Sequence, residues 1–333
     1  MQRYYLGVDV GATKTHALVA DETGRALGFG QAGPGNYQVV GYAGMAAALH
    51  EATGQALTMA ATTIEQIAGA GLGIGGYDWP SQQSRMLETI HTAGIQAPLE
   101  IVNDAVLGLL AGAPEGWGVA LVAGTSNNCR GRDQHGREGR VTGEGIRFGE
   151  YGGAVELVMK AVHAVTAAWS RRGLTTRLVD AFIAAVGAQS LDDLLEGLAL
   201  ERYRLDASAA PLVFQVAQSG DAVAQHVVTW SAHELGDLAV GVIRQLGFER
   251  LSFDVVLLGS MYNGGPLLLE PLRATIHAVA PGARLTRLDV PPVVGGVLLA
   301  IQQVGHDPHL TREALVRSSA KLLLPASRVA EPF

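Results

Sequence analysis

The chain of 333 residues contains a single cysteine, Cys129. One thiol excludes a disulfide framework, a structural zinc site and a four-thiolate iron–sulfur cluster within one chain. Such sparse use of cysteine fits a reducing compartment, and we expect a cytoplasmic protein.

Charge is sparse as well, and long apolar runs are absent. Charged residues make up 17% of the chain, the net charge is -7, and no run of lysine or arginine occurs. This balance argues against partners such as nucleic acid or an anionic membrane, because both require a positive surface. No apolar run approaches the length of a membrane span, about 18 residues, and the first residues lack the pattern of a secretion signal. We therefore expect a soluble protein whose partners are small molecules.

Apolar residues and glycine are abundant, in contrast. Hydrophobic residues make up 48% of the sequence, which also has 43 glycines separated by apolar segments. This composition indicates a globular chain with tight turns, long enough for two core-bearing domains.

The order of elements restarts once along the chain. Strand-like runs in 3–31, a helical pattern in 41–57 and a strand at 99–104 predict a mixed sheet flanked by helices. A Pro/Gly-rich break at 112–118 is followed by a similar order. We predict an α/β fold with two lobes, residues 1–111 and 112–333, and a site in the cleft between them.

A tight turn follows the first predicted strand, in GVDVGATKT. The turn consists of Gly11, Ala12, Thr13 and Lys14, and Asp9 stands at the end of the strand before it. Exposed N–H groups and a hydroxyl are the donors that phosphate oxygens require, and small residues permit close approach. The Asp9 carboxylate is suited to hold Mg²⁺ through water, which phosphoryl transfer requires.

A second turn of this kind occurs in VAGTSNNCRG, with Gly124, Thr125, Ser126 and Asn127. Either turn alone is explained equally well as an ordinary hairpin connection. Two such turns about one domain length apart favour a clamp for the phosphates of a nucleotide. The chain has no GxxxxGK[ST] sequence, so the pattern differs from a P-loop.

Asp104 is the candidate general base. It ends a buried strand whose last residues are Asn103 and Asp104, at the edge where open α/β sheets bind ligands. The competing interpretation is that Asp104 caps the helix that follows. We favour catalysis, because Asn103 offers another capping side chain and the strand end points into the cleft.

Uncharged amides near the turns suit a sugar. Asn36, Asn127 and Asn128 can donate to and accept from hydroxyl and amide groups, although each alone is typical of a turn. Glu144 or Glu150 is a further candidate to accept hydrogen bonds from sugar hydroxyls, with a solvated loop charge as the alternative for Glu144.

Four arginines make the second hairpin locally basic. Such a row could attract ATP but is more typical of a solvated strand face. They are Arg130, Arg132, Arg137 and Arg140.

Several motifs occur in a fixed order: GVDVGATKT, IVND, LVAGTSNNCRG, GEGIRFGEYGGA, a helix led by AQSGD, and LLGSMYNGG. In this series, which spans nearly the whole chain, the sequence resembles N-acetylglucosamine kinases and their BadF/BadG/BcrA/BcrD-type ATPase relatives. The resemblance implies two ribonuclease-H-like lobes of the actin-like ATPase fold that close on ATP and a sugar. It also implies transfer of a phosphoryl group to the sugar 6-hydroxyl with Mg²⁺, and it is compatible with a homodimer.

Carried over residue by residue, the resemblance implies Asp104 as the base and Asp9 as the Mg²⁺-linked aspartate. The resemblance implies Thr13, Thr125, Ala217 and Gly259 as ATP contacts, and together with the turn residues Gly11, Lys14, Gly124 and Ser126 they make up the predicted ATP-binding set. It implies Asn36, Asn127 and Asn128 as sugar contacts, and together with Asn103, Asp104, Gly145 and Glu150 they make up the predicted sugar-binding set.

Two departures from the family pattern leave the sugar open. The usual GTGS turn reads GTSN here, and Glu150 stands where a sugar-binding aspartate is usual. The additional methylene shifts the pocket wall by more than about 1 Å, enough to change which sugar is held. The acceptors that remain are N-acetylglucosamine, glucosamine, N-acetylmuramic acid and another hexose.

Two other classes compete with a kinase. An ATPase that activates a partner enzyme requires cysteines for a shared cluster, and Cys129 has no CxxC partner. A nucleotide-binding regulator of this superfamily carries a helix-turn-helix arm before the first phosphate motif, and the residues before Gly7 leave no room for one.

Overall fold

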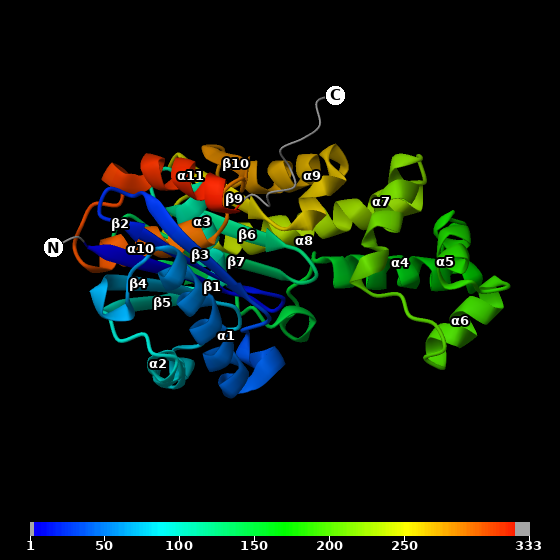
Figure 1. Cartoon of the computed structure of the whole chain (residues 1–333). Coiled ribbons are helices and arrows are strands. Elements are labelled where there is room, and N and C mark those ends of the chain that lie inside the picture. Colours follow the sequence, from blue (N-terminus) through cyan, green and yellow to red (C-terminus); the bar gives the residue numbers. More distant parts are fainter. Residues whose placement is uncertain (1–2, 324–333) are drawn as a thin grey trace, which may run out of the picture.

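Two mixed β-sheets, each flanked by helices, form two lobes (Figure 1). The computed structural model describes residues 3–323. Residues 1–2 and the last ten residues of the predicted second lobe lie outside the described part. The predicted α/β class with two helix-flanked mixed sheets is confirmed. No helix among the described residues has the length and apolar character needed to cross a membrane.

The first sheet has the strand order β3-β2-β1-β4-β5. Its strands are β1 (Tyr4–Val10), β2 (Thr15–Asp21), β3 (Ala26–Ala32), β4 (Ile67–Ile74) and β5 (Leu99–Asn103). The first three strands are antiparallel because short turns join them, whereas β4 and β5 run parallel to β1 after helical crossovers. The carboxyl ends of β1, β4 and β5 therefore meet at one edge.

Helices within the first half cover this sheet. They are α1 (Tyr37–Met59), the 3₁₀ turns η1 (Ile64–Gln66) and η2 (Pro80–Gln82), α2 (Gln83–Thr92) and α3 (Asp104–Gly112). Helix α1 lies directly on β3 because glycine there leaves room for the helix backbone. A Cβ at Gly30 would lie 2.0 Å from the carbonyl oxygen of Ala52.

The second sheet has the order β10-β9-β6-β7-β8. Its strands are β6 (Gly118–Ala123), β7 (Asn127–Arg132), β8 (Glu138–Arg140), β9 (Phe253–Leu258) and β10 (Ala283–Arg287). Strands β6, β7 and β8 again form an antiparallel meander, and β9 runs parallel to β6. The second lobe thus repeats the sheet plan of the first.

A helical arm, residues 154–218, projects from the second lobe, on the right of Figure 1. The remaining elements of this lobe are η3 (Gly145–Phe148), α4 (Ala154–Trp169), α5 (Leu178–Val186), α6 (Leu191–Ala199), η4 (Ala207–Ala209), α7 (Ala210–Gln218), α8 (Ala222–Leu246), η5 (Ser260–Gly264) and α9 (Pro266–His277). Helix α8 begins where Asp221 accepts a hydrogen bond from the N–H of Ala224, and it ends at Gly247 with φ +72°. It joins the arm to the second sheet.

The last two helices return to the first sheet. Helices α10 (Val293–Gln303) and α11 (His309–Leu323) lie beside β1, β3 and β4 rather than on the second sheet. The approach is close, since a Cβ at Gly7 would lie 2.4 Å from the amide nitrogen of Val297. The domain ranges 1–111 and 112–333 remain a prediction, and these contacts place the end of the second range against the first lobe.

Candidate active site

A cavity of about 210 Å³ lies where the two lobes face each other. The first lobe contributes Asp9, the turn 11–14 and Asp104, and the second lobe contributes Val122 and Leu258. Because β1 and β5 run in the same direction with β4 between them, their carboxyl ends bring Asp9 and Asp104 to one edge. The structure thus brings together the predicted metal ligand, the first phosphate turn and the predicted base.

Burial raises the pKa of both carboxyl groups in this cavity. The pKa of Asp9 rises to about 7, through burial first and the nearby charge of Asp104 second, while Lys14 opposes the rise. The pKa of Asp104 rises to about 6, again mainly through burial, with the Ala105 N–H opposing it. A carboxylate that ionises just below neutral pH is well matched to accept a proton from a hydroxyl group.

Asn103, and not Asp104, is the cap of α3. Its Oδ1 accepts a hydrogen bond from the N–H of Ala105 at 3.1 Å, and Asp104 is the first helical residue. One oxygen of Asp104 also accepts from the Ala105 N–H at 3.0 Å. The alternative interpretation of Asp104 as the N-cap is therefore wrong. The cap of the helix does not depend on the carboxylate, which leaves it free for chemistry.

The two predicted phosphate turns are tight hairpin connections, between β1 and β2 and between β6 and β7, and their role in phosphate binding stays a prediction. The Gly11 N–H donates to the Lys14 carbonyl at 3.0 Å, and the Gly124 N–H donates to the Ser126 carbonyl at 2.9 Å. Thr13, Thr125 and Ser126 are exposed. Thr13 lines the 210 Å³ cavity, whereas Thr125 lines a second cavity of about 570 Å³. Thr13 and Thr125 therefore line two separate cavities rather than one pocket.

The 570 Å³ cavity falls within the size range of small-molecule binding sites. Phe214 and Gln215 of α7 form one wall, and Met261 and Asn263 of η5 form another. Gly259, just before η5, has φ +106°, and a Cβ there would lie 2.2 Å from the carbonyl oxygen of Ala123. The glycine is therefore needed for this chain path between β6 and β9.

Ala217 lies away from that cavity. It is fully buried in the core on α7, three residues beyond the cavity-lining Phe214. Its assignment to adenosine binding stays a prediction.

Gly75 lies close to two of the predicted site residues, Asp104 and Asn36. A Cβ at this residue would lie 3.2 Å from Asp104 Oδ2 and 3.3 Å from Asn36 Nδ2. The other end of the Asn36 amide caps α1 by accepting from the N–H of Gln38 at 2.8 Å. The predicted base and the predicted sugar-binding amide thus converge on one spot. The sequence carries a signal for this position, because the pair Gly75-Gly76 directly follows a buried strand.

The two predicted sugar-binding amides of the second lobe, Asn127 and Asn128, have different partners. Asn127 Nδ2 donates to the Glu150 carbonyl at 3.2 Å and lies 3.4 Å from a Glu156 carboxylate oxygen. Asn127 Oδ1 is buried and has no hydrogen-bond partner among residues 3–323. Asn128 Nδ2 donates to Asn103 Oδ1 at 3.2 Å. Asn128 therefore reaches the first lobe directly.

Glu150 organises the loop that leads to Gly145. Its two carboxylate oxygens accept from the N–H groups of Thr142 at 2.6 Å and Gly143 at 2.9 Å. Gly145 itself has φ +59°, the left-handed region that favours glycine. Glu144 is exposed and accepts from Trp79 Nε1 at 3.2 Å. The roles of Gly145 and Glu150 in sugar binding stay predictions.

The interpretation of the arginine row as a solvated strand face is wrong for two of its members. Arg130 is 3% exposed and forms an ion pair with Asp78 of the first lobe. Arg132 is 8% exposed and pairs with Glu100 of β5 at 3.1 Å. The alternation of positions 128, 130 and 132 along a predicted strand was the available signal, because it places the three side chains on one face.

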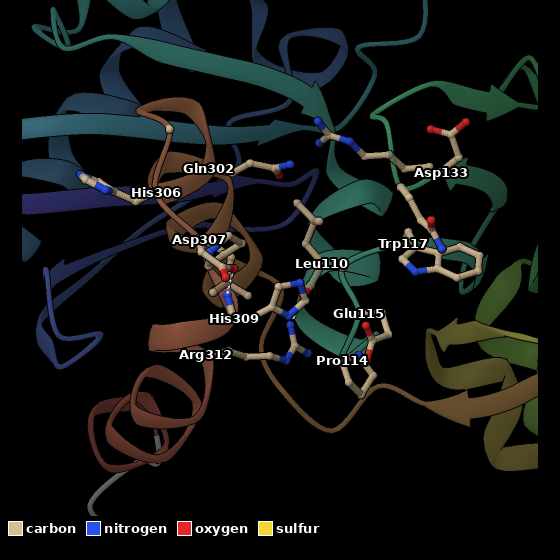
Figure 2. Close-up of a pocket in the computed structure, with 16 residues that line it drawn as sticks. Leu110, Pro114, Glu115, Trp117, Asp133, Gln302, His306, Asp307, His309 and Arg312 are labelled. Carbon is tan, nitrogen blue, oxygen red and sulfur yellow. Dashed lines mark hydrogen bonds between the residues drawn. The ribbon is translucent and has the colours of Figure 1, made fainter.

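Another cavity, of about 460 Å³, contains none of the predicted site residues (Figure 2). Two of its charged side chains, Arg312 and Asp307, are engaged in hydrogen bonds to the backbone. Arg312 donates to the Leu110 carbonyl at 2.6 Å and also binds the Ala111 carbonyl, and Asp307 accepts from the His309 N–H at 2.9 Å. We assign no catalytic role to this cavity.

The sequence matches the model of the BadF/BadG/BcrA/BcrD ATPase family over residues 6–300. It is 23% identical over 304 residues to an N-acetylmuramic acid/N-acetylglucosamine kinase of Clostridium acetobutylicum, covering 90% of this chain and 98% of that protein. It is 25% identical over 310 residues to an N-acetyl-D-glucosamine kinase of Dictyostelium discoideum, covering 89% of this chain and 97% of that protein. The fold is similar to that of a candidate N-acetylglucosamine kinase of Chromobacterium violaceum, with a TM-score of 0.63 and 23% identity, covering 89% of this chain and 98% of that protein.

Proposed function

The chain belongs to the BadF/BadG/BcrA/BcrD ATPase family, and from that premise we propose that it is an ATP-dependent amino-sugar kinase. It would transfer the γ-phosphoryl group of ATP to the 6-hydroxyl of N-acetylglucosamine or a related sugar. The observation that supports this most is the convergence of Asp104 and Asn36 on Gly75, beside the first phosphate turn. The kinases to which the chain is similar act on sugars of this class.

Asp104 accepts the proton of the attacking hydroxyl in this proposal. Its pKa of about 6 leaves it mostly ionised at neutral pH while keeping it more basic than an ordinary aspartate. Asn36 Nδ2, whose partner oxygen is committed to the cap of α1, is free to donate to a sugar oxygen beside Asp104. Together the two groups would orient the hydroxyl and activate it.

The two turns would hold the phosphates, and the 570 Å³ cavity would hold adenosine. Residues Gly11–Lys14 supply N–H groups, a hydroxyl and one positive charge on the first lobe, and Thr125 with Ser126 supplies hydroxyls on the second. Acceptor-only phosphate oxygens need donors of this kind. Closure of the lobes would exclude water from the transfer.

The residues present fit a magnesium ion that enters with ATP. Two half-buried carboxyl groups, Asp9 and Asp104, face one cavity, and each is harder to ionise there without a cation nearby. Within residues 3–323, no group of three or more His, Cys, Asp or Glu side chains is placed to hold a metal by itself. Asp9 would hold Mg²⁺ jointly with the phosphates, and the bound ion would offset charge on the phosphoryl oxygens.

The alternative of a partner-activating ATPase is less well supported. Such an activator requires an accessible thiolate for a shared cluster. Cys129 is fully buried, and burial raises the pKa of its thiol well above the ordinary value. A cytoplasmic location and a homodimer stay predictions from the sequence.

A coupled ADP-release assay with Mg·ATP tests the proposal. The acceptor panel is N-acetylglucosamine, glucosamine, N-acetylmannosamine, N-acetylmuramic acid, glucose and no sugar. We expect release that depends on one amino sugar and that falls by about 10²–10⁴-fold in Asp104→Asn, while ATP binding persists. Sugar-independent release would point to an ATPase, and turnover near the wild-type rate in Asp104→Asn would remove this residue from the mechanism.

A further inference from the structure

Strand β7 presents a row of polar side chains to the first lobe. Every second residue from 128 to 132 makes an interlobe contact, as the two-residue period of a strand requires. The contacts are Asn128 Nδ2 to Asn103 Oδ1 at 3.2 Å, Arg130 to Asp78, and Arg132 Nη2 to Glu100 Oε1 at 3.1 Å. We call this row the interlobe ladder.

Asp78 is the centre of the ladder. It lies in the loop after β4, and its side chain is 8% exposed, against 3% for Arg130. Its carboxylate accepts from Arg130 and from Asn103 Nδ2, the latter at 3.1 Å, and its backbone carbonyl accepts from Arg140. Two arginines of the second lobe therefore hold one residue of the first lobe.

The contact between Asp78 and Asn103 fixes the orientation of the Asn103 amide. On one side, Asn103 Nδ2 faces two acceptors, the Asp78 carboxylate and the Tyr77 carbonyl at 3.2 Å. On the other side, Asn103 Oδ1 faces two donors, the N–H of Ala105 and the amide of Asn128. A flipped amide would lose all four interactions.

The same amide sets the start of α3. Asn103 caps the helix through the Ala105 N–H, and Asp104 is the next residue, with its own oxygen on that N–H. A rotation of the Asn103 side chain would therefore move the first turn of α3 and the Asp104 carboxylate with it. Asp78 controls this arrangement without lining the cavity that contains Asp104.

We propose that Asp78 is a positioning residue for phosphoryl transfer: paired with Arg130 of the facing lobe, it orients Asn103 and so holds Asp104 toward the acceptor hydroxyl. This inference rests on the proposed kinase function. It assigns the ladder a role on the acceptor side of the cleft. Within the described residues, no hydrogen bond or ion pair joins the turn 11–14 to the turn 124–126, so the nucleotide side has no such tie.

Asp78→Ala and Asp78→Asn test the proposal, with Asp254→Ala as a matched control. Asp254 of β9 is likewise a buried carboxylate in an ion pair, bonded by Arg284 at 3.0 and 3.1 Å. It lies at the far end of β9 from the cavity-lining Leu258. The control therefore carries the structural cost of a broken ion pair without the link to Asn103.

We expect Asp78→Ala to lower kcat about 10- to 100-fold while KM for ATP stays within about twofold, because misplacement of the base affects transfer and not nucleotide binding. Asp78→Asn retains an oxygen that can accept from Asn103 Nδ2, so its kcat should lie between those of wild type and Asp78→Ala. Asp254→Ala should lower the melting temperature and keep kcat within about twofold of wild type.

Three results would overturn the inference. The first is an Asp78→Ala enzyme that is folded and has wild-type kcat. The second is a loss of kcat in Asp254→Ala as large as that in Asp78→Ala, which would indicate a general effect of instability. The third applies if Asp78→Ala does not fold: it is an Asp78→Asn enzyme with wild-type kcat. A wild-type protein with no sugar-dependent ADP release would instead contradict the kinase proposal, before any variant is measured.

Discussion

Asp104→Asn should make the protein more stable at neutral pH while it abolishes most of the activity. In the native fold, burial raises the pKa of Asp104 from 3.8 to about 6. The folded protein therefore binds a proton at this site more readily than the unfolded chain, and ionisation of the carboxyl costs stability. An asparagine removes the charge and can still accept the Ala105 N–H, and the cap of α3 belongs to Asn103.

The size of the gain in stability follows from the rise in the pKa of Asp104. A rise of about two pKa units corresponds to at most about 3 kcal/mol at pH values above 6. For a chain of this length, that is a rise in melting temperature of about 4 °C. The size of this penalty depends on pH. The wild-type carboxyl is protonated in both states below 3.8, and the penalty grows as pH rises from 3.8 to about 6 and stays constant above that.

Thermal unfolding of both proteins from pH 4 to pH 8 checks this. The melting temperature of Asp104→Asn should exceed that of wild type at pH 8, and the difference should vanish near pH 4. A variant less stable than wild type at pH 8 would refute the reasoning, as would a gain that does not depend on pH.

Further predictions concern the rate, the second phosphate turn and one glycine. As pH falls below about 6, Asp104 takes up a proton, so wild-type kcat should fall; a kcat profile that is flat down to pH 5 would contradict its role as base. Thr125→Val should weaken nucleotide binding in calorimetry without lowering the melting temperature, since Thr125 is exposed; a fall in melting temperature alone would make that hairpin structural. Gly259→Ala should lower the melting temperature because of the 2.2 Å approach to Ala123 at φ +106°, whereas Gly241→Ala in α8, which meets no atom within 4 Å, should be neutral or stabilising.

Local patterns predicted the strands, the turns and the position of Asp104. Each of these depends on residues adjacent in sequence: a buried run before Gly11, another before Gly124, and a third ending at Asn103. The sequence alone places Asp9 and Asp104 each at the carboxyl end of a buried strand, and the parallel direction of β1, β4 and β5 brings the two ends to one edge.

Contacts between distant segments were beyond the reach of those patterns. The polar sequence around Arg130 predicts an exposed side chain. Arg130 is buried because it pairs with Asp78, which lies 52 residues earlier in the sequence. The sequence around Gly75 does not predict that Asn36 and Asp104 lie beside it, because all three residues are distant from one another in the chain. Ala217 lies in the core because the face of α7 that carries it packs against the neighbouring elements. A match to a family motif does not predict which face of a helix is buried.

The return of α10 to the first sheet has a consequence for synthesis of the chain. The backbone of α10 covers β1 and β4 at Gly7 and Gly71, so a face of the earliest strands stays bare until residues near 300 have been made. A nascent chain that has completed the second sheet still carries an unfinished first lobe. A shortened product ending before residue 293 would expose that apolar face, so truncation late in the chain should damage the half that was translated first.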